Sequence, residues 1–318
     1  MDICVWGPRG SGKTWLIDSF IHQVNNVQTK LKENESQFDI EIRDILGKLV
    51  YCSDLEPRAT MDIDYSAFTV ARRFLPKDHS YHEECIKHAC ENVHELSILD
   101  SPGDIITGEI LTHAHSAKDE AEVMAGRAKI KSAKYLIVVI NSVVRSEEQT
   151  HNPSETFSVN LRRLVNLTRD QRQKVFLCFT KIDENLGPNA SLDTMLPLLF
   201  GNSSNEVASL LRELISSQQS DIKNYFVSAP GYYYNANNEM IPNIENGRLI
   251  NKNEWEPHGV CKLFFDIFDD CERESLSRLD RTLPTKLPGK ILNKVFTELA
   301  QAQIKDIQES HISYHEMR

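Results

Sequence analysis

Short apolar runs alternate with longer amphipathic stretches along this chain. Residues 135–142 and 174–181 are nearly all apolar, which is typical of strands that a parallel sheet buries on both faces. Further strands are predicted from shorter runs of apolar, β-branched and aromatic residues, at 2–7, 61–74, 95–100 and 224–228. The hydrophobic pattern therefore predicts six strands spread over most of the chain.

Helices are predicted between and after these strands, at 13–25, 40–49, 104–133, 153–170, 191–217 (one or two helices), 257–279 and 289–308. This alternation predicts an α/β fold of three layers, with a mostly parallel sheet and helices on both faces. We expect one domain over residues 1–279, with insertions at about 26–50, 75–94 and 230–256, and then a C-terminal helical extension over residues 280–318. The apolar stripe of the last helix would pack on this domain or face a partner subunit.

Composition narrows the classes of protein that fit. The formal net charge is −10, with 40% hydrophobic and 26% charged residues, so a nucleic acid is not expected as the main partner. The seven cysteines are scattered and odd in number, which suits reduced thiols in the cytosol. Because no apolar run is long enough to span a membrane and no lipidation motif is present, we expect a cytoplasmic protein without a membrane anchor.

A glycine-rich turn between the first strand and the first helix carries the clearest motif. Residues Gly7–Thr14 match the phosphate-loop pattern G-x-x-x-x-G-K-S/T at every fixed position. Such a loop turns its backbone N–H groups inward as an anion nest at a helix N-terminus. Lys13 can then reach the β- and γ-phosphates, and the Thr14 hydroxyl can coordinate Mg²⁺. We expect phosphate contacts from Gly7, Gly10, Ser11, Gly12, Lys13 and Thr14.

A second motif follows the apolar strand at 95–100. Asp100 ends this strand, and Gly103 comes three residues later, in a D-x-x-G pattern. A carboxylate in this position can hold Mg²⁺ through water, and the backbone N–H of the glycine can meet a γ-phosphate. The pattern is weak alone, but it is specific at a strand end that follows a phosphate loop.

Two further segments at strand ends suit a guanine base. In Thr180-Lys181-Ile182-Asp183, the Asp183 carboxylate can accept hydrogen bonds from the guanine N1–H and exocyclic amine, which adenine lacks as a pair. Lys181 can lay its aliphatic stem along the base. Ser228 and Ala229 end the last strand, where their backbone N–H groups can meet the guanine O6.

In this order, the four motifs resemble those of the GTPase superclass of phosphate-loop proteins, the TRAFAC or Ras-like GTPases. The resemblance covers about residues 1–277, and Thr180 stands where the usual motif has Asn. It implies a six-stranded sheet, nucleotide at the C-terminal ends of the strands, Mg²⁺ as cofactor, GTP and GDP as ligands, and hydrolysis of GTP to GDP and phosphate.

The resemblance also assigns catalytic candidates. Thr60, in a loop before a predicted strand, is the candidate switch threonine that closes over Mg²⁺, whereas Thr69 lies inside that strand. Arg58 is a candidate internal arginine finger. Asp104 stands where many hydrolysing members carry Gln or His, so hydrolysis is expected to be slow or to depend on a partner. The candidate catalytic residues are thus Lys13, Arg58, Thr60 and Asp104, and the candidate Mg²⁺ ligands are Thr14, Thr60 and Asp100.

Several alternatives stay open on the sequence. The chain would act as a nucleotide-dependent switch or assembly regulator with a protein effector or partner subunits, or as a pseudo-GTPase scaffold without turnover, or as a phosphate-loop ATPase. The long insertions are similar to GTPases of bacterial conflict systems, including the double-GTPase families, which would imply a role in a multi-protein defence system. The His- and Cys-rich connector at 79–94 is a polar linker or a metal site, and Tyr232–Tyr234 is loop packing or a partner patch.

Overall fold

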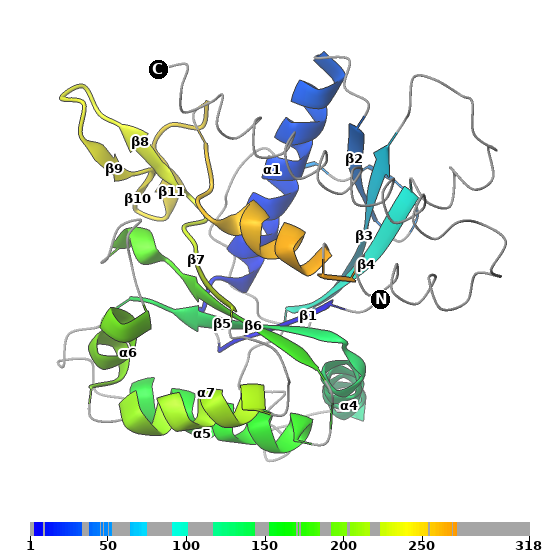
Figure 1. Ribbon diagram of the computed structural model, residues 1–318, viewed down its shortest axis with the longest axis vertical. Helices are drawn as coiled ribbons and strands as arrows, with labels where there is room; N and C mark the ends of the chain where they lie inside the picture. Colours follow the sequence, from blue (N-terminus) through cyan, green and yellow to red (C-terminus); the bar gives the residue numbers. More distant parts are fainter. Residues whose placement is uncertain are drawn as a thin grey trace, which may run out of the picture.

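The central sheet contains seven strands (Figure 1): β1 (Ile3–Trp6), β2 (Phe38–Asp44), β3 (Asp64–Phe74), β4 (Glu91–Asp100), β5 (Tyr135–Asn141), β6 (Lys174–Thr180) and β7 (Lys223–Phe226). Their order across the sheet is β2-β3-β4-β1-β5-β6-β7. The pairings of β1 with β4 and β5, of β5 with β6 and of β6 with β7 are parallel. The pairings of β2 with β3 and of β3 with β4 are antiparallel. The predicted mostly parallel α/β sheet is confirmed, but the expectation of six strands is wrong.

The computed structural model describes residues 3–8, 10–33, 38–44, 46, 48–49, 51–52, 64–74, 91–100, 117–143, 153–169, 171, 173–184, 192–201, 204–216, 223–253, 255–268 and 270–271. The predicted helix at 289–308, the connector up to residue 90 and residues 104–116 lie outside this set. Among the helices that the structure describes, none is both long and apolar enough to cross a membrane.

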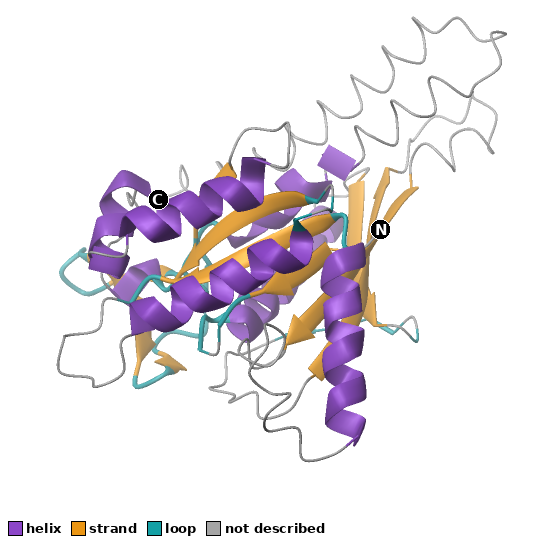
Figure 2. Cartoon of the chain, turned by 90° about the horizontal axis from the view of Figure 1, so that it is seen from below, coloured by secondary structure: helices purple, strands orange, loops and turns teal. Residues whose placement is uncertain are grey.

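Helices cover both faces of the sheet, as Figures 1 and 2 show. One face packs against α1 (Lys13–Glu33) and a helix over residues 260–268; the other packs against α4 (Ala117–Ser132), α5 (Pro153–Thr168), α6 (Leu192–Phe200) and α7 (Ser204–Ser216). Because side chains alternate along a strand, Ile3 and Val5 belong to the first core and Cys4 and Trp6 to the second. The three predicted layers are confirmed.

The first core is held together by aromatic residues of the two helices that share it. Phe20 of α1 stacks on Phe264 with ring centroids 4.1 Å apart, and it also meets Phe265 and Phe268. All four rings are buried. The helix at 260–268 is therefore fixed against α1 although more than 200 residues separate them in the sequence.

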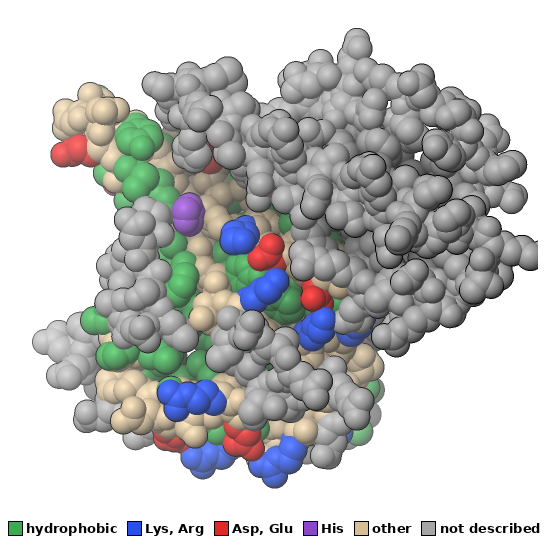
Figure 3. Space-filling model, viewed as in Figure 1, with side chains coloured by type: hydrophobic (Ala, Val, Ile, Leu, Met, Phe, Trp, Pro, Cys, Tyr) green, Lys and Arg blue, Asp and Glu red, His purple; other side chains and the backbone are tan. Residues whose placement is uncertain are grey.

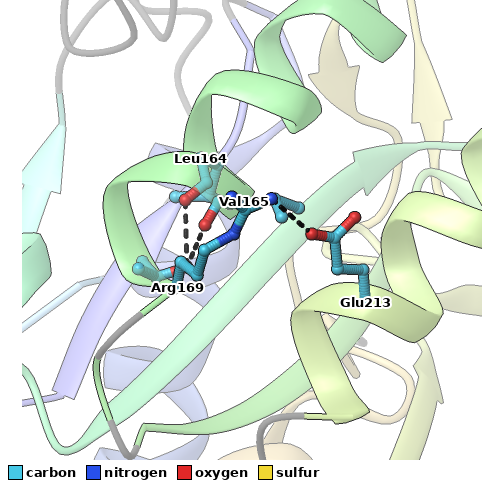
Figure 4. A network of polar contacts seen from close by, with 5 residues as sticks. Leu164, Val165, Arg169 and Glu213 are labelled. Atoms are coloured by element: carbon cyan, nitrogen blue, oxygen red, sulfur yellow. Dashed lines mark hydrogen bonds and ion pairs between the residues drawn. The ribbon is translucent and has the colours of Figure 1, made fainter.

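The helices of the second face are joined at their surface by two ion pairs. Arg162 contacts Glu206 at 2.5 Å, and Arg169 contacts Glu213 at 2.8 Å (Figure 4). The partners advance by seven residues on each helix, so α5 and α7 run in the same direction for two turns. These pairs are largely solvent-exposed, and the buried leucines of both helices supply most of the packing.

The helix predicted at 40–49 is wrong, because much of this region is a strand. There, α1 continues to Glu33, and residues 38–44 form β2, which pairs with β3 along its whole length. Part of the predicted insertion at 26–50 thus belongs to the sheet and its covering helix. Similarly, β4 begins at Glu91 rather than at residue 95.

The predicted insertion at 230–256 forms two small hairpins. The strands β8 (Tyr232–Tyr234) and β9 (Met240–Pro242) pair with each other, as do β10 (Ile244–Glu245) and β11 (Arg248–Leu249). Asn246 and Gly247 connect the second pair with φ values of 50° and 76°, as a two-residue hairpin turn of the Asn-Gly type requires. In Figure 3 hydrophobic side chains follow the first hairpin on the visible face.

His22 joins α1 to two distant segments. Its ring stacks on Trp255 with centroids 3.8 Å apart, and its two nitrogens lie 3.1 Å from the carbonyl oxygens of Cys52 and Trp255. Burial lowers the His22 pKa from its ordinary 6.5, although both carbonyls act in the opposite direction. His22 is thus neutral at pH 7, and one nitrogen donates at a time.

We predict that His22 makes the protein less stable in mild acid. The unfolded chain takes up a proton at His22 below about pH 6.5, before the folded chain does, so the free energy of unfolding falls with pH by at most about 1.4 kcal/mol per unit. In urea titrations, the stability advantage of wild type over His22→Gln should shrink between pH 7.5 and 5.5. It should stay constant between pH 7.5 and 8.5, where the histidine is neutral in both states. A constant gap across the acid range would contradict the lowered pKa.

Candidate functional site

The predicted site segments meet at one edge of the sheet. Since β1, β4, β5, β6 and β7 are mutually parallel, their C-terminal ends share that edge, where open α/β sheets bind ligands. The register pairs Ile3 with Leu96. Gly7 lies four residues after Ile3 and Asp100 four residues after Leu96, so the two lie at the same height on neighbouring strands. Across this edge the order is therefore the end of β4, the Gly7–Thr14 loop, the end of β5, Thr180–Asp183 and Ser228–Ala229.

The loop after β1 has a backbone that favours glycine at three positions. A Cβ atom on Gly7 would lie 2.6 Å from Ser11 Oγ and 2.7 Å from the Val139 carbonyl oxygen, so only glycine fits there. Gly10 and Gly12 have φ values of 74° and 87°, in the region that favours glycine. The Ser11 hydroxyl oxygen is buried and has no hydrogen-bond partner among the described residues.

Lys13 begins α1 and turns its side chain back into this loop. Its Nζ donates to the carbonyl oxygens of Gly7 at 2.9 Å and Pro8 at 3.1 Å, and the residue is only 5% exposed. The ammonium is therefore held at the loop, where its charge would lie against a bound phosphate. Thr14 follows in the first helical turn and is half-buried.

The segment after β6 is attached to the phosphate loop through Thr180. The Thr180 hydroxyl donates to the carbonyl oxygen of Ser11, while the Ile140 carbonyl lies farther away at 3.3 Å. A Cβ on Gly12 would lie 3.5 Å from Thr180 Oγ1 and 3.9 Å from Lys181 Cε, so both side chains lie over the loop. The threonine that replaces the expected asparagine thus positions the loop.

Asn141 is a contact to the loop that the sequence analysis missed. It ends β5, and its side-chain amide lies 3.4 Å from the Gly10 carbonyl oxygen while its Oδ1 accepts from the Val143 N–H at 3.0 Å. Its position at the end of a predicted buried strand was the only signal in the sequence.

Asp183 is the buried carboxylate of the site. It lies in a short 3₁₀ helix, η2 (Ile182–Glu184), is 8% exposed, and its Oδ1 has no hydrogen-bond partner within the described part of the chain. Burial raises the Asp183 pKa, and the Ser228 hydroxyl and the Lys181 charge oppose that rise. Lys181 has φ = 60°, a backbone conformation that costs a non-glycine residue energy and is often found at functional sites.

The segment after β7 is fixed beside Asp183 by Trp255 of the insertion and by His258, which follows it. Ser228 and His258 exchange backbone hydrogen bonds of 3.1 and 2.9 Å, and the Trp255 indole N–H donates to the Ala229 carbonyl at 2.9 Å. A hydrogen bond from the Ser228 hydroxyl opposes the rise in the Asp183 pKa, so the third and fourth motifs lie side by side.

The predicted catalytic residues lie partly beyond the structure's described ranges. Arg58, Thr60, Gly103 and Asp104 are outside them, and Asp100 is described only as the last residue of β4. Thr14 follows the loop that leaves β1, and the end of β4 lies beside that loop at the same edge of the sheet. Within the described residues, no group of three or more His, Cys, Asp or Glu could hold a metal ion.

No known protein-family model and no curated protein matches the chain. Its structure is similar to solved structures of GTP-binding proteins. Era bound to MgGDPNP and a 16S ribosomal RNA fragment is 12% identical with a TM-score of 0.31, over 72% of this chain and 50% of that one. The SRb-GTP/SRX complex of Chaetomium thermophilum is 11% identical with a TM-score of 0.38, over 71% and 90%. Nucleolar GTP-binding protein 1 of Plasmodium falciparum is 12% identical with a TM-score of 0.32, and the match covers 92% of this chain and 94% of that one.

The chain thus aligns with only half of the Era protein. Likenesses at such low identity and TM-score do not bear on individual residues.

We predict that Thr180→Val weakens nucleotide binding by roughly fivefold, the equivalent of about 1 kcal/mol, because the Ser11 carbonyl loses its donor while the side-chain shape is kept. Thr168→Val is the matched control, since Thr168 is also buried but donates within α5, to the Leu164 carbonyl at 2.9 Å. Titration calorimetry with GDP would measure both variants. Equal affinities for the two would contradict a positioning role for Thr180.

Proposed function

We propose that this chain binds guanine nucleotide with Mg²⁺ and hydrolyses GTP to GDP and phosphate, as a nucleotide-dependent switch or assembly regulator. The observation that carries the proposal is the buried Asp183 carboxylate, whose Oδ1 has no hydrogen-bond partner in the described part of the chain. It lies beside Ser228 and three residues after Thr180, which donates a hydrogen bond to the Gly7–Thr14 loop. The exocyclic amine and the N1–H of guanine are a pair of donors that would supply hydrogen bonds to this carboxylate.

In this proposal the nest of Gly7–Thr14 binds the phosphates, and Lys13 neutralises their charge from its position at the Gly7 and Pro8 carbonyls. Thr14, Asp100 and Thr60 would hold Mg²⁺, which when bound stabilises the charge that develops between the β- and γ-phosphates. Gly103 would sense the γ-phosphate. The water that attacks would be oriented by Asp104, with Arg58 stabilising the transition state.

Two rival functions remain distinct from this one. A phosphate-loop ATPase would not need a buried carboxylate in the base site, because adenine offers no N1–H and amine donor pair. A pseudo-GTPase scaffold would bind guanine nucleotide in the same way without turnover, and Asp104 favours it, because a carboxylate adds negative charge near the γ-phosphate.

The proposal extends to the cellular setting. A protein effector or partner subunits would receive the nucleotide signal, since the chain shows no second catalytic motif. We propose a cytoplasmic location, in keeping with five described cysteines that form no disulfide. A role in a bacterial multi-protein defence system is the most specific form of the proposal, and it rests only on the sequence resemblance to conflict-system GTPases.

We predict that Asp183→Asn weakens GDP binding about 10- to 100-fold, because it removes two charge-assisted hydrogen bonds to the base, and improves binding of xanthosine diphosphate, whose C2 oxygen suits an amide donor. Competition binding with GDP, xanthosine diphosphate and ADP would measure this change. Asp270→Asn is the control, because Asp270 pairs with Lys174 away from the site. If Asp183→Asn bound GDP like wild type, or if wild type preferred ADP, the guanine assignment would be wrong.

We predict that Arg58→Ala slows single-turnover GTP hydrolysis by at least about tenfold while GDP affinity is unchanged, because an arginine finger acts on the transition state. Arg248→Ala, at an exposed position of β11, should leave the rate unchanged. Rates would be measured at low and at high protein concentration. An unchanged rate in Arg58→Ala would exclude the arginine finger, and no phosphate release from wild type at either concentration would favour the scaffold.

A further inference from the structure

The first hairpin of the insertion is joined rigidly to the segment beside Asp183. Gly231 has φ = 71°, and a Cβ there would lie 1.7 Å from the Glu256 carbonyl oxygen. Its N–H donates to Ser228 Oγ at 3.0 Å, and its carbonyl accepts from the Asn243 N–H at 3.0 Å. These contacts fix the backbone from Ser228 to Gly231, and so they fix the position at which the next residue, Tyr232, begins β8.

Tyr232 begins β8 and contacts the segment that is bridged to Ser228. Its ring packs edge-on against His258, with centroids 5.9 Å apart and planes at 81°, and His258 is the residue bridged to Ser228. The pKa of Tyr232 is raised, first by burial and then by the negative charge of Asp183.

The Tyr232 hydroxyl is buried and, like Asp183 Oδ1, has no hydrogen-bond partner among the described residues. Buried polar atoms are nearly always partnered, because each orphan costs free energy. Two such atoms on neighbouring elements, a carboxylate oxygen and a phenol oxygen, indicate that one ligand with several N–H donors completes both.

The base edge of guanine has this donor set. Its N1–H and one exocyclic amine proton satisfy the carboxylate, and the second amine proton still needs an acceptor. A phenol oxygen is an acceptor with its own proton to donate. We propose that the Tyr232 hydroxyl is a second polar contact for the exocyclic amine of the guanine base held by Asp183.

Tyr232 is on this view a specificity-determining residue, and the inference rests on the proposed guanine-nucleotide function. Asp183 distinguishes guanine from adenine. Tyr232 adds discrimination against hypoxanthine, which keeps the N1–H of guanine but lacks the amine.

The test compares GDP, inosine diphosphate and ADP on wild type, Tyr232→Phe and Tyr233→Phe. Phenylalanine keeps the ring that packs on His258. Tyr233 is the matched control, because it is the next residue of β8, pairs with Ile241 and, by strand alternation, faces the other way. Tyr232→Phe should weaken GDP binding about five- to tenfold and leave binding of inosine diphosphate unchanged, whereas Tyr233→Phe should change neither.

Equal weakening for both nucleotides, or no change for either, would overturn the inference. Thermal unfolding without nucleotide adds a second readout: Tyr232→Phe should be as stable as wild type or more stable, because it removes a buried hydroxyl without a partner. A large loss of stability would show that the hydroxyl has a structural partner, and this too would overturn the inference. If wild type failed to prefer GDP over ADP, the proposed function itself would be wrong. If wild type preferred GDP and Tyr232→Phe bound GDP equally well, only the role inferred for Tyr232 would be wrong.

Discussion

The parallel pairing of β1 between β4 and β5 is the constraint on which the site depends. β1 has only four residues, all buried, and the chain must leave it at the edge where four other parallel strands also end. Backbone hydrogen bonding fixes the register of each neighbour, so segments more than 200 residues apart in sequence arrive at one place. The phosphate loop, the end of β4, Thr180–Asp183 and Ser228 are neighbours for this reason.

The sequence predicts this framework well where burial on both faces leaves a simple pattern. The strands β5 and β6 are apolar runs that end in polar residues, and the phosphate loop has fixed glycines, so these elements were found with nearly correct limits. β2 was missed for a physical reason. Ile42, Ile45, Leu46 and Leu49 have helical spacing, while Phe38, Ile40 and Ile42 alternate as in a strand, and pairing with β3 decides between the two patterns.

The site was predictable in its motifs but not in its contacts. Sequence order indicated that Asp183 and Ser228 would meet, whereas the hydrogen bond from Thr180 to Ser11 depends on the packing of β6 against the loop. Tyr232 is one of three consecutive tyrosines, and composition cannot tell which one lies near Asp183. That choice depends on Gly231, whose left-handed backbone and contact with Glu256 set the direction in which β8 begins.

Three buried polar atoms, on Ser11, Asp183 and Tyr232, have no partner among the residues that the structure describes, and they lie on segments of this one edge. A buried polar atom without a partner costs stability in the protein without nucleotide. A ligand that satisfies all three recovers that cost on binding, so its affinity and the stability of the fold are linked. The three atoms also differ in what they can recognise. Ser11 lies in the loop proposed to bind phosphate, whereas Asp183 and Tyr232 lie on the segments proposed to bind the base, and their two oxygens can accept hydrogen bonds from N–H donors.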